Sequence, residues 1–332
     1  MKKRLHFATF TCFIFSLILL QSKSLFSQAL MFGNEKTRVE VGINVGPSFF
    51  LGDLGGNRGK GTRFVKDVNL SMTKIMKGAY ATVYPNEWLG LRAAFQMGVL
   101  EGDDRLIKNN GSHELFRKQR NLDFRSNITE LYVAAELYPI MLLYNGNEDY
   151  KPRLRPYGVI GVGAFKFNPQ GSLTDNSGKV TWHDLKPLHT EGQGFDEFPD
   201  RKEYSLTQIN IPMGLGVKYM VSERINVSFE LLLRKSFTDY IDDVSTNYID
   251  PNLFVKYLPA ADAVTARRIS DKVFAIVNPN LSRNAPGIQR GNPSQNDSYF
   301  TTFVKFGIRL GPVFENTYAR NAANMMRCPT RF

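Results

Sequence analysis

Hydrophobic and polar residues alternate along two early stretches of the chain. From Val39 to Leu51 every odd position is apolar, and mostly small or polar residues lie between them. The same alternation returns from Leu89 to Val99. A period of two predicts β-strands with one apolar and one polar face. Both runs are longer than the ~5–6 residues usual for strands of soluble proteins. Their length therefore favours strands that cross a bilayer at a tilt, with the apolar face toward lipid.

The pattern predicts eight strands, at residues 38–51, 76–84, 88–101, 125–138, 154–168, 205–220, 224–237 and 298–311. The second strand alternates weakly, and the fifth is rich in glycine. Short or intermediate links (85–87, 139–153 and 221–223) alternate with long ones (52–75, 102–124, 169–204 and 238–297). Short periplasmic turns and long external loops are typical of outer-membrane barrels, and lipid cannot satisfy an open strand edge. We therefore expect an all-β fold, an eight-stranded antiparallel transmembrane up-and-down β-barrel with long external loops over 38–311.

The N-terminus predicts export. Lys2, Lys3 and Arg4 precede an apolar stretch, and small residues follow it at Ser27 and Ala29. This order is typical of a secretory signal peptide. We assign it to residues 1–27, with cleavage after Ser27 or after Ala29. An uncleaved helical anchor is the alternative, although the apolar stretch is short for a spanning helix. Residues 28–37 are a lead into the barrel, and residues 312–332 form a periplasmic tail.

Charge and cysteine content narrow the possible partners. The formal charge of +11 falls to +7 when the four bases of the signal peptide are removed, 11 minus 4. A modest positive excess favours anionic lipid headgroups of the outer membrane, and nucleic acid is not an expected partner of an exported protein. Of the two cysteines, Cys12 lies in the signal peptide and only Cys328 remains. An intramolecular disulfide is therefore excluded.

The polar faces of the predicted strands carry both acids and bases. The predicted inward positions are Glu40, Arg92, Gln96, Glu130, Glu136, Lys166, Lys218, Glu230, Arg234, Lys305 and Arg309. Eight strands leave an interior just wide enough for side chains, and buried charges must be paired. We therefore expect a plug of ion pairs, with a conducting pore as the alternative.

Two groups of residues could bind metal. His183 and His189 lie in one long link, but their spacing matches no common zinc site. Asp239, Asp242 and Asp243 could bind calcium, but they lack the spacing of an EF-hand loop. Carboxylates that accept hydrogen bonds from backbone amides are the preferred interpretation. No nucleophile, base and orienting group follow a catalytic pattern. We therefore assign no catalytic, cofactor-binding or metal residue and no cofactor, and do not expect an enzyme.

Several motifs carry a family resemblance. They are Gly52-Asp53-Leu54, the run from Phe124 to Leu131, Pro156-Tyr157 with Gly161-Val162-Gly163, the run from Leu188 to Gly194, the run from Arg234 to Ser245, and Cys328-Pro329. With them the chain resembles the PorG-like outer-membrane barrels associated with type IX secretion. The resemblance implies a non-enzymatic barrel that contacts periplasmic ring proteins of the secretion machine, a lipoprotein and its partner.

Three classes of function follow from these observations. The first is a structural or partner-anchoring component of a secretion apparatus, whose protein contacts we expect on the link 139–153 and the tail 312–332. The tail contains aromatic, Met and Arg residues, which are enriched at interfaces. The second is a passive barrel that stabilises the envelope or binds a surface ligand. The third is an outer-membrane enzyme, which the lack of a catalytic pattern disfavours.

Overall fold

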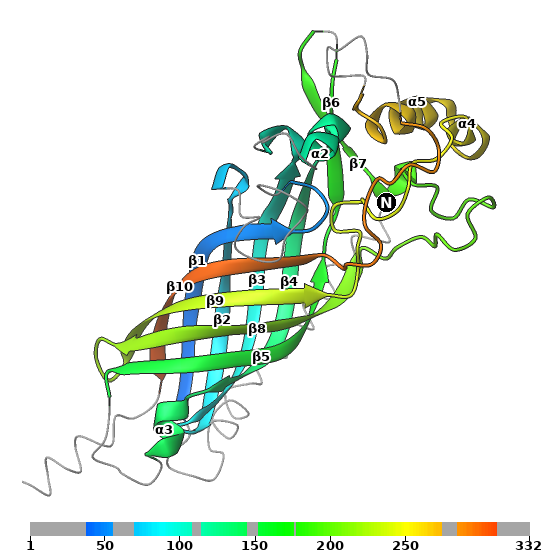
Figure 1. Ribbon diagram of the computed structural model, residues 1–332. Helices are drawn as coiled ribbons and strands as arrows, with labels where there is room; N and C mark the ends of the chain where they lie inside the picture. Colours follow the sequence, from blue (N-terminus) through cyan, green and yellow to red (C-terminus); the bar gives the residue numbers. More distant parts are fainter. Residues whose placement is uncertain are drawn as a thin grey trace, which may run out of the picture.

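Eight long strands form a closed antiparallel barrel in the computed structural model (Figure 1). The structure describes residues 38–55, 70–107, 114–144, 152–175, 177–273 and 284–310. The barrel strands are β1 (Arg38–Leu51), β2 (Lys74–Asn86), β3 (Leu89–Asp103), β4 (Asp123–Leu137), β5 (Leu154–Lys166), β8 (Thr207–Met220), β9 (Ile225–Ser236) and β10 (Ser298–Leu310). The predicted signal peptide, the lead 28–37 and the tail 312–332 lie outside the described residues, so these three assignments stay predictions.

Each barrel strand pairs with its neighbour along the chain, and β1 pairs with β10 to close the ring. At the closing seam Val41 lies opposite Ile308, and Glu40 lies opposite Arg309. Closure leaves no barrel strand with an unpaired edge, which is the condition for a sheet that crosses lipid. The predicted fold class and all eight predicted strands are confirmed.

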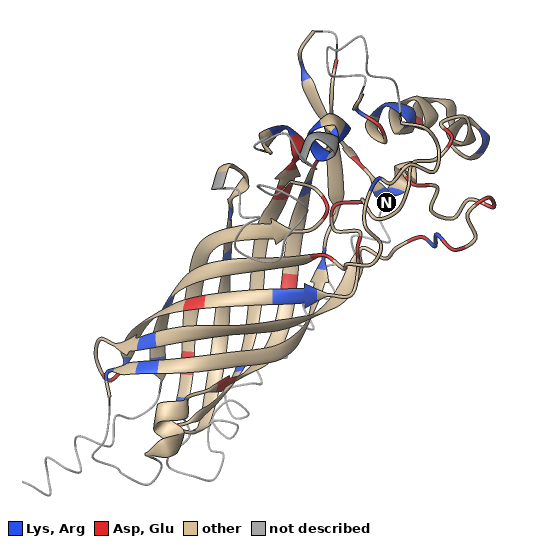
Figure 2. Ribbon diagram, viewed as in Figure 1, with Lys and Arg blue, Asp and Glu red and all other residues tan. Residues whose placement is uncertain are grey.

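The outer wall of the barrel is apolar. Large side chains that are more than half exposed include Ile43, Leu91, Leu131, Val133, Ile160, Val162, Ile209, Leu215 and Phe229. Leu215 is 72% exposed and Leu131 is 62% exposed, values that would be costly if this wall faced water. Charged residues are sparse along the barrel strands and frequent among the elements at one end of the barrel (Figure 2). The wall is therefore the lipid-facing surface.

The elements outside the barrel gather at its two ends (Figure 1). Because long loops are typical of the external side, we assign as external the end that holds η1 (Leu70–Met72), η2 (Asp104–Leu106), α2 (Glu114–Arg120), β6 (Pro169–Thr174), β7 (Val180–Asp184), η3 (Lys186–Leu188), α4 (Leu253–Tyr257) and α5 (Ala260–Ile269). We call the described residues of the long links, which include these elements, the cap. The periplasmic end holds α3 (Pro139–Leu143), between β4 and β5. No helix among the described residues is long and apolar enough to span a membrane.

The cap has a hydrophobic core of its own. Its buried members are Leu185, Leu188, Phe195, Ile249, Phe254, Ala263, Ala266 and Ile269. The short hairpin β6–β7 extends the sheet at β4, where Arg125 pairs with Gln170. The described residues of the long external links are thus packed and include regular elements, which their sequences did not predict.

Candidate functional site

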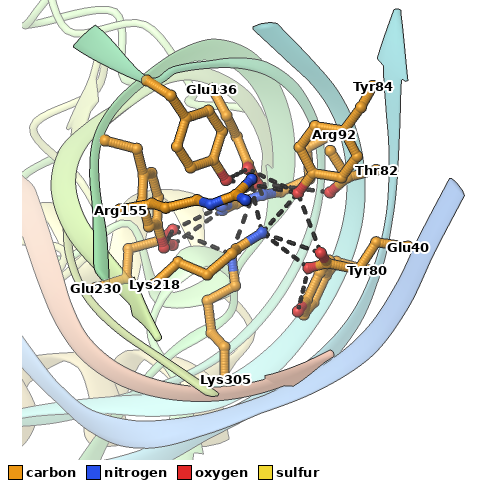
Figure 3. Close-up of polar contacts among 12 residues, drawn as sticks. Glu40, Tyr80, Thr82, Tyr84, Arg92, Glu136, Arg155, Lys218, Glu230 and Lys305 are labelled. Carbon is orange, nitrogen blue, oxygen red and sulfur yellow. Dashed lines mark hydrogen bonds and ion pairs between the residues drawn. The ribbon is translucent and has the colours of Figure 1, made fainter. Parts of the chain in front are cut away.

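Six charged side chains meet in the periplasmic half of the lumen. We call them the central network: Glu40, Arg92, Glu136, Lys218, Glu230 and Lys305. Alternation on six different strands turns each of them inward, and each is at most 2% exposed. Three acids face three bases, so the network carries no net charge (Figure 3).

Arg92 is the centre of this network. Its Nη1 and Nη2 atoms lie 2.9 Å and 2.7 Å from the two carboxylate oxygens of Glu230. Its Nε atom donates to Glu136 at 2.6 Å. Lys305 Nζ lies 3.1 Å from Glu230 Oε2, and Lys218 Nζ lies 2.9 Å from Glu40 Oε1. Bidentate pairing of a guanidinium with a carboxylate is the strongest form of such contacts.

Tyrosine hydroxyls complete the hydrogen bonding of the network. Tyr157 donates to Glu230 at 2.8 Å, and Tyr80 donates to Glu40 at 3.1 Å. The Tyr84 hydroxyl accepts from Lys218 Nζ at 2.6 Å. Tyr80 and Tyr84 lie on β2 and Tyr157 on β5, the two barrel strands that supply none of the six charges. All eight barrel strands therefore contribute to this one cluster.

A second ion pair lies nearer the external end. Arg234 Nε is 3.2 Å from Glu130 Oε2, and both side chains are fully buried. Arg234 also donates to Gln96 Oε1 at 2.5 Å, and Asn210 donates to the second oxygen of Glu130 at 2.7 Å. The predicted plug of paired charges is confirmed. That it prevents conduction stays a prediction.

One predicted inward position is wrong. Lys166 is exposed on the outer side of β5, and its neighbour Phe165 faces the lumen with 1% exposure. Phe165 belongs to an apolar layer between the ion pairs and the cap, together with Met76, Phe124, Phe167, Tyr299 and Phe303. This layer closes the external end of the lumen with packed side chains.

The acidic cluster joins the barrel to the cap. Asp242 accepts hydrogen bonds from the backbone amides of Leu54 at 2.9 Å and Val244 at 3.0 Å. Asp297 accepts one from the amide of Ile241 at 2.8 Å. These carboxylates thus accept hydrogen bonds from backbone amides. The prediction of such bonds is confirmed for Asp242. Asp243 differs, since it accepts from the hydroxyls of Tyr204 and Thr190.

Two buried arginines connect the cap segments with one another. Arg290 Nη1 lies 2.8 Å from Glu191 Oε1 and 2.6 Å from the carbonyl of Asp243. Arg120 donates to Asp104 at 2.7 Å and to the carbonyl of Arg290 at 2.6 Å. Glu191 also accepts from the amides of Ser245 and Thr246. These contacts hold three separate links, 102–124, 169–204 and 238–297, in one arrangement.

Three carboxyls where the barrel meets the cap have no base beside them among the described residues. None of the ion pairs formed by the described residues includes Asp239, Asp242 or Asp297. Burial raises the pKa of the Asp239 carboxyl to about 8. Burial, and then the neighbouring carboxylates, raise the pKa values of Asp242 and Asp297 well above their usual range. We call Asp239, Asp242 and Asp297 the acidic joint.

The two histidines of the cap have separate local roles. His183 Nε2 lies 3.1 Å from Thr181 Oγ1 on the same strand. His189 adopts a left-handed backbone conformation with φ 46°, and its Nδ1 lies 2.6 Å from the carbonyl oxygen of Gln193. Within the part of the chain that the structure describes, no three His, Cys, Asp or Glu side chains are grouped as metal ligands would be.

Comparison with known proteins finds fold similarity only. No known protein family and no curated protein matches the chain. Similar solved structures include Ail, the attachment invasion locus protein of Yersinia pestis, the neisserial surface protein NspA, and a major outer-membrane protein of Thermus thermophilus. They are 8%, 9% and 10% identical, with TM-scores of 0.32, 0.31 and 0.35. Each comparison covers 82% of this chain, and 97%, 96% and 99% of the other.

The strand pairing and the apolar outer wall show which class of membrane protein this chain belongs to. The barrel is closed, its outer wall is apolar, and its charged side chains pair inside. Barrels of this architecture reside in the bacterial outer membrane. The chain is an eight-stranded outer-membrane β-barrel.

Proposed function

We propose that this chain is a non-enzymatic, non-conducting barrel that anchors partner proteins of a type IX secretion apparatus at the outer membrane. The observation that carries the proposal is the filled lumen. Charged, tyrosyl and apolar side chains occupy the interior from the periplasmic half to the cap. Such an interior leaves the two end surfaces as the places where function can reside.

The resemblance to PorG-like barrels supplies the identity of the partners. Its longest motif, from Arg234 to Ser245, begins inside the lumen and ends in the cap. Arg234 forms an ion pair with Glu130, and Asp242 accepts a hydrogen bond from the backbone amide of Leu54. The motif is therefore the segment that fixes the external links on the barrel. The ring proteins, a lipoprotein and its partner, would bind at the opposite, periplasmic end.

Affinity purification from membranes in mild detergent tests this function. We expect the tagged barrel to bring down the periplasmic lipoprotein and its partner, and we expect its deletion to reduce secretion. The untagged strain is the control for unspecific capture. A barrel that purifies alone, from cells whose secretion is unaffected by its deletion, would contradict the proposal.

The cap favours a second candidate function, a passive barrel that binds a ligand at the cell surface. Its own hydrophobic core and its buried Arg290–Glu191 ion pair give the external end a defined shape. Removing cap residues 253–269, which hold α4 and α5, separates the two functions. Secretion and co-purification should survive this deletion if the partner binds at the periplasmic end, and a secretion defect with lost co-purification would favour the external end.

A further inference from the structure

Three arginines line the periplasmic mouth of the lumen. Arg38 of β1, Arg155 of β5 and Arg309 of β10 surround a small cavity, whose wall also includes Tyr84, Asn86, Glu87 and Tyr138. Arg155 is 6% exposed, and the Arg309 side chain is 10% exposed. Figure 3 shows Arg155 pointing into the lumen beside the central network. The cavity of about 10 Å³ has room for one group about the size of a water molecule.

The charges of Arg155, Arg309 and Glu87 do not balance among the described residues. Glu87 is shared by two of the arginines, at 2.7 Å from Arg38 Nη1 and 3.1 Å from Arg155 Nη1. Arg309 Nε lies 3.6 Å from Glu40 Oε2, beyond hydrogen-bond distance, and is buried without a hydrogen-bond partner among the described residues. Among the described residues, Glu87 is the one carboxylate outside the central network that pairs with these side chains. Arg155 shares it with Arg38, and Arg309 pairs with Glu40 of the network.

Glu40 does not correct this imbalance, because it belongs to the central network. Both of its oxygens accept from Lys218 Nζ, at 2.9 Å and 3.1 Å, and Tyr80 donates to it as well. The network above the mouth has three acids and three bases. A buried guanidinium is costly unless an anion pairs with it, so the mouth is built to receive one more negative charge.

The position of the mouth identifies the source of that charge. The three arginines lie inside the ring of strands, whereas lipid headgroups lie outside the barrel wall. The cavity has room for one oxygen atom at the tip of a ligand, and a charge-assisted hydrogen bond from arginine to a carboxylate oxygen is among the strongest such contacts. A side-chain or terminal carboxylate on an extended protein segment meets both conditions.

We propose that the periplasmic mouth binds a carboxylate of a periplasmic partner protein, with Arg309 and Arg155 as its main ligands. This proposal rests on the anchoring function above and names the chemistry by which the barrel takes hold of its partner. The partner segment enters along the barrel axis and adds the anion that the mouth lacks.

A fluorescein-labelled peptide of six glutamates tests the site on the full mature chain in nanodiscs of zwitterionic lipid. We expect binding by anisotropy that weakens with salt, and that weakens at least tenfold in Arg309→Gln and in Arg155→Gln. Arg224→Gln is the matched control, because Arg224 is exposed on the β8–β9 turn at the same end. It should change the affinity less than twofold, and a peptide of six glutamines should not bind.

Equal binding by all variants, or no binding to the parent protein, would refute the proposal. If Arg309→Gln fails to form a heat-modifiable barrel, Arg309→Lys keeps the charge and should retain binding more weakly than the parent. Retention of phosphatidylglycerol by the parent but not by Arg309→Gln in native mass spectrometry, without peptide binding, would show a lipid site and refute the proposal.

The same variants distinguish this inference from the anchoring function. Co-purification of the partner with a double Arg155→Gln, Arg309→Gln variant at the parent's yield would refute the carboxylate site and leave the anchoring function intact. If no protein co-purifies with the parent chain at all, the anchoring function fails, and the partner named here fails with it.

Discussion

The lumen and the acidic joint both bury carboxylates, but they stabilise them in different ways. In the lumen each carboxylate lies beside a base, as Glu230 lies beside Arg92 and Lys305. In the joint, Asp242 and Asp297 accept hydrogen bonds from backbone amides and form no ion pair with a described residue. Strands around a ring can place an acid on one strand and a base on another, so that the two side chains meet in the lumen. Links that fold over the end of the ring use acids to fix their own backbone.

This difference predicts that the lumen is sensitive to the loss of one charged side chain and that the cap is sensitive to pH. Removing one member of a lumen pair leaves an uncompensated buried charge, which is among the most costly changes in a protein. In the joint the carboxyls are stable when they carry a proton, so the cap should respond to pH.

Glu230→Leu should have the largest effect. It leaves Arg92 and Lys305 with a single carboxylate, Glu136, between them. We expect a loss of about 5 kcal/mol in the free energy of unfolding, measured by urea denaturation of the barrel in lipid. Glu223→Leu is the control, because Glu223 is exposed on a turn and should shift stability by less than about 0.5 kcal/mol. Similar midpoints for both variants would show that the network does not stabilise the barrel.

Arg234→Leu should have a smaller effect in the same assay. It removes the base beside Glu130, but Asn210 still donates to one oxygen of that carboxylate. We expect a loss of about 3 kcal/mol. Lys235→Leu provides the matched comparison, since Lys235 is the next residue on β9 and is exposed on the outer wall. An unchanged midpoint for Arg234→Leu would mean that this pair or its register is wrong.

The cap should loosen as the pH rises. The folded pKa of Asp239, about 8, lies above the usual value of an unfolded aspartate, ~3.9. The folded state therefore binds more protons, and the stabilisation is present below pH ~4 and lost as the pH rises through about 8. Hydrogen exchange of the cap amides should be faster at pH 9 than at pH 6, after correction for intrinsic rates.

Asp239→Asn tests the origin of this loosening. It keeps a neutral group at position 239 at all pH values, so it should protect the cap at pH 9 by about 1–3 kcal/mol and reduce the pH dependence, with Asp242 and Asp297 supplying the remainder. Asp200→Asn, at an exposed position of the cap, should keep the profile of the parent. Equal profiles for all three proteins would show that Asp239 does not titrate in this range.

The smallest expected effect is on conductance. Paired charges, tyrosines and the layer with Phe124 and Phe303 fill the lumen. The purified chain should give little or no steady current in a planar bilayer, at pH 6 and at pH 9 alike. A large, stable single-channel step would show that the interior opens, and would favour a porin.

Period-two alternation was enough to predict the barrel. β1 begins and ends at the predicted residues, and the other strands differ from their predicted ranges by a few residues. In β5 the alternation does not distinguish the two faces of the strand. Tyr157 and Phe165 face the lumen while Ile160 and Val162 face lipid, so both faces are apolar. With no contrast between the faces, Lys166 was assigned to the wrong side.

The sequence predicted which charges turn inward but not how they pair. Arg92 on β3 meets Glu230 on β9, although these strands are not neighbours in the sheet. Such a contact depends on strand tilt and stagger around the whole ring, which no local pattern encodes. Arg38 and Arg155 were missed because they lie at strand ends, where alternation is too short to assign a face. Short elements of the cap such as β7 were not predicted either, because five residues are too few to show a clear alternation.

The central network has a consequence for how the protein reaches its membrane. Glu40 lies on the first strand and Lys305 on the last, and their partners are spread over the strands between. A chain that has inserted only some of its strands would hold ionised groups without their counter-charges. Assembly should therefore be cooperative, with the seam between β1 and β10 closing at the step that completes the charge balance. A chain shortened before β10 would lack a cation as well as a strand, and should stall as an open sheet at the assembly machinery.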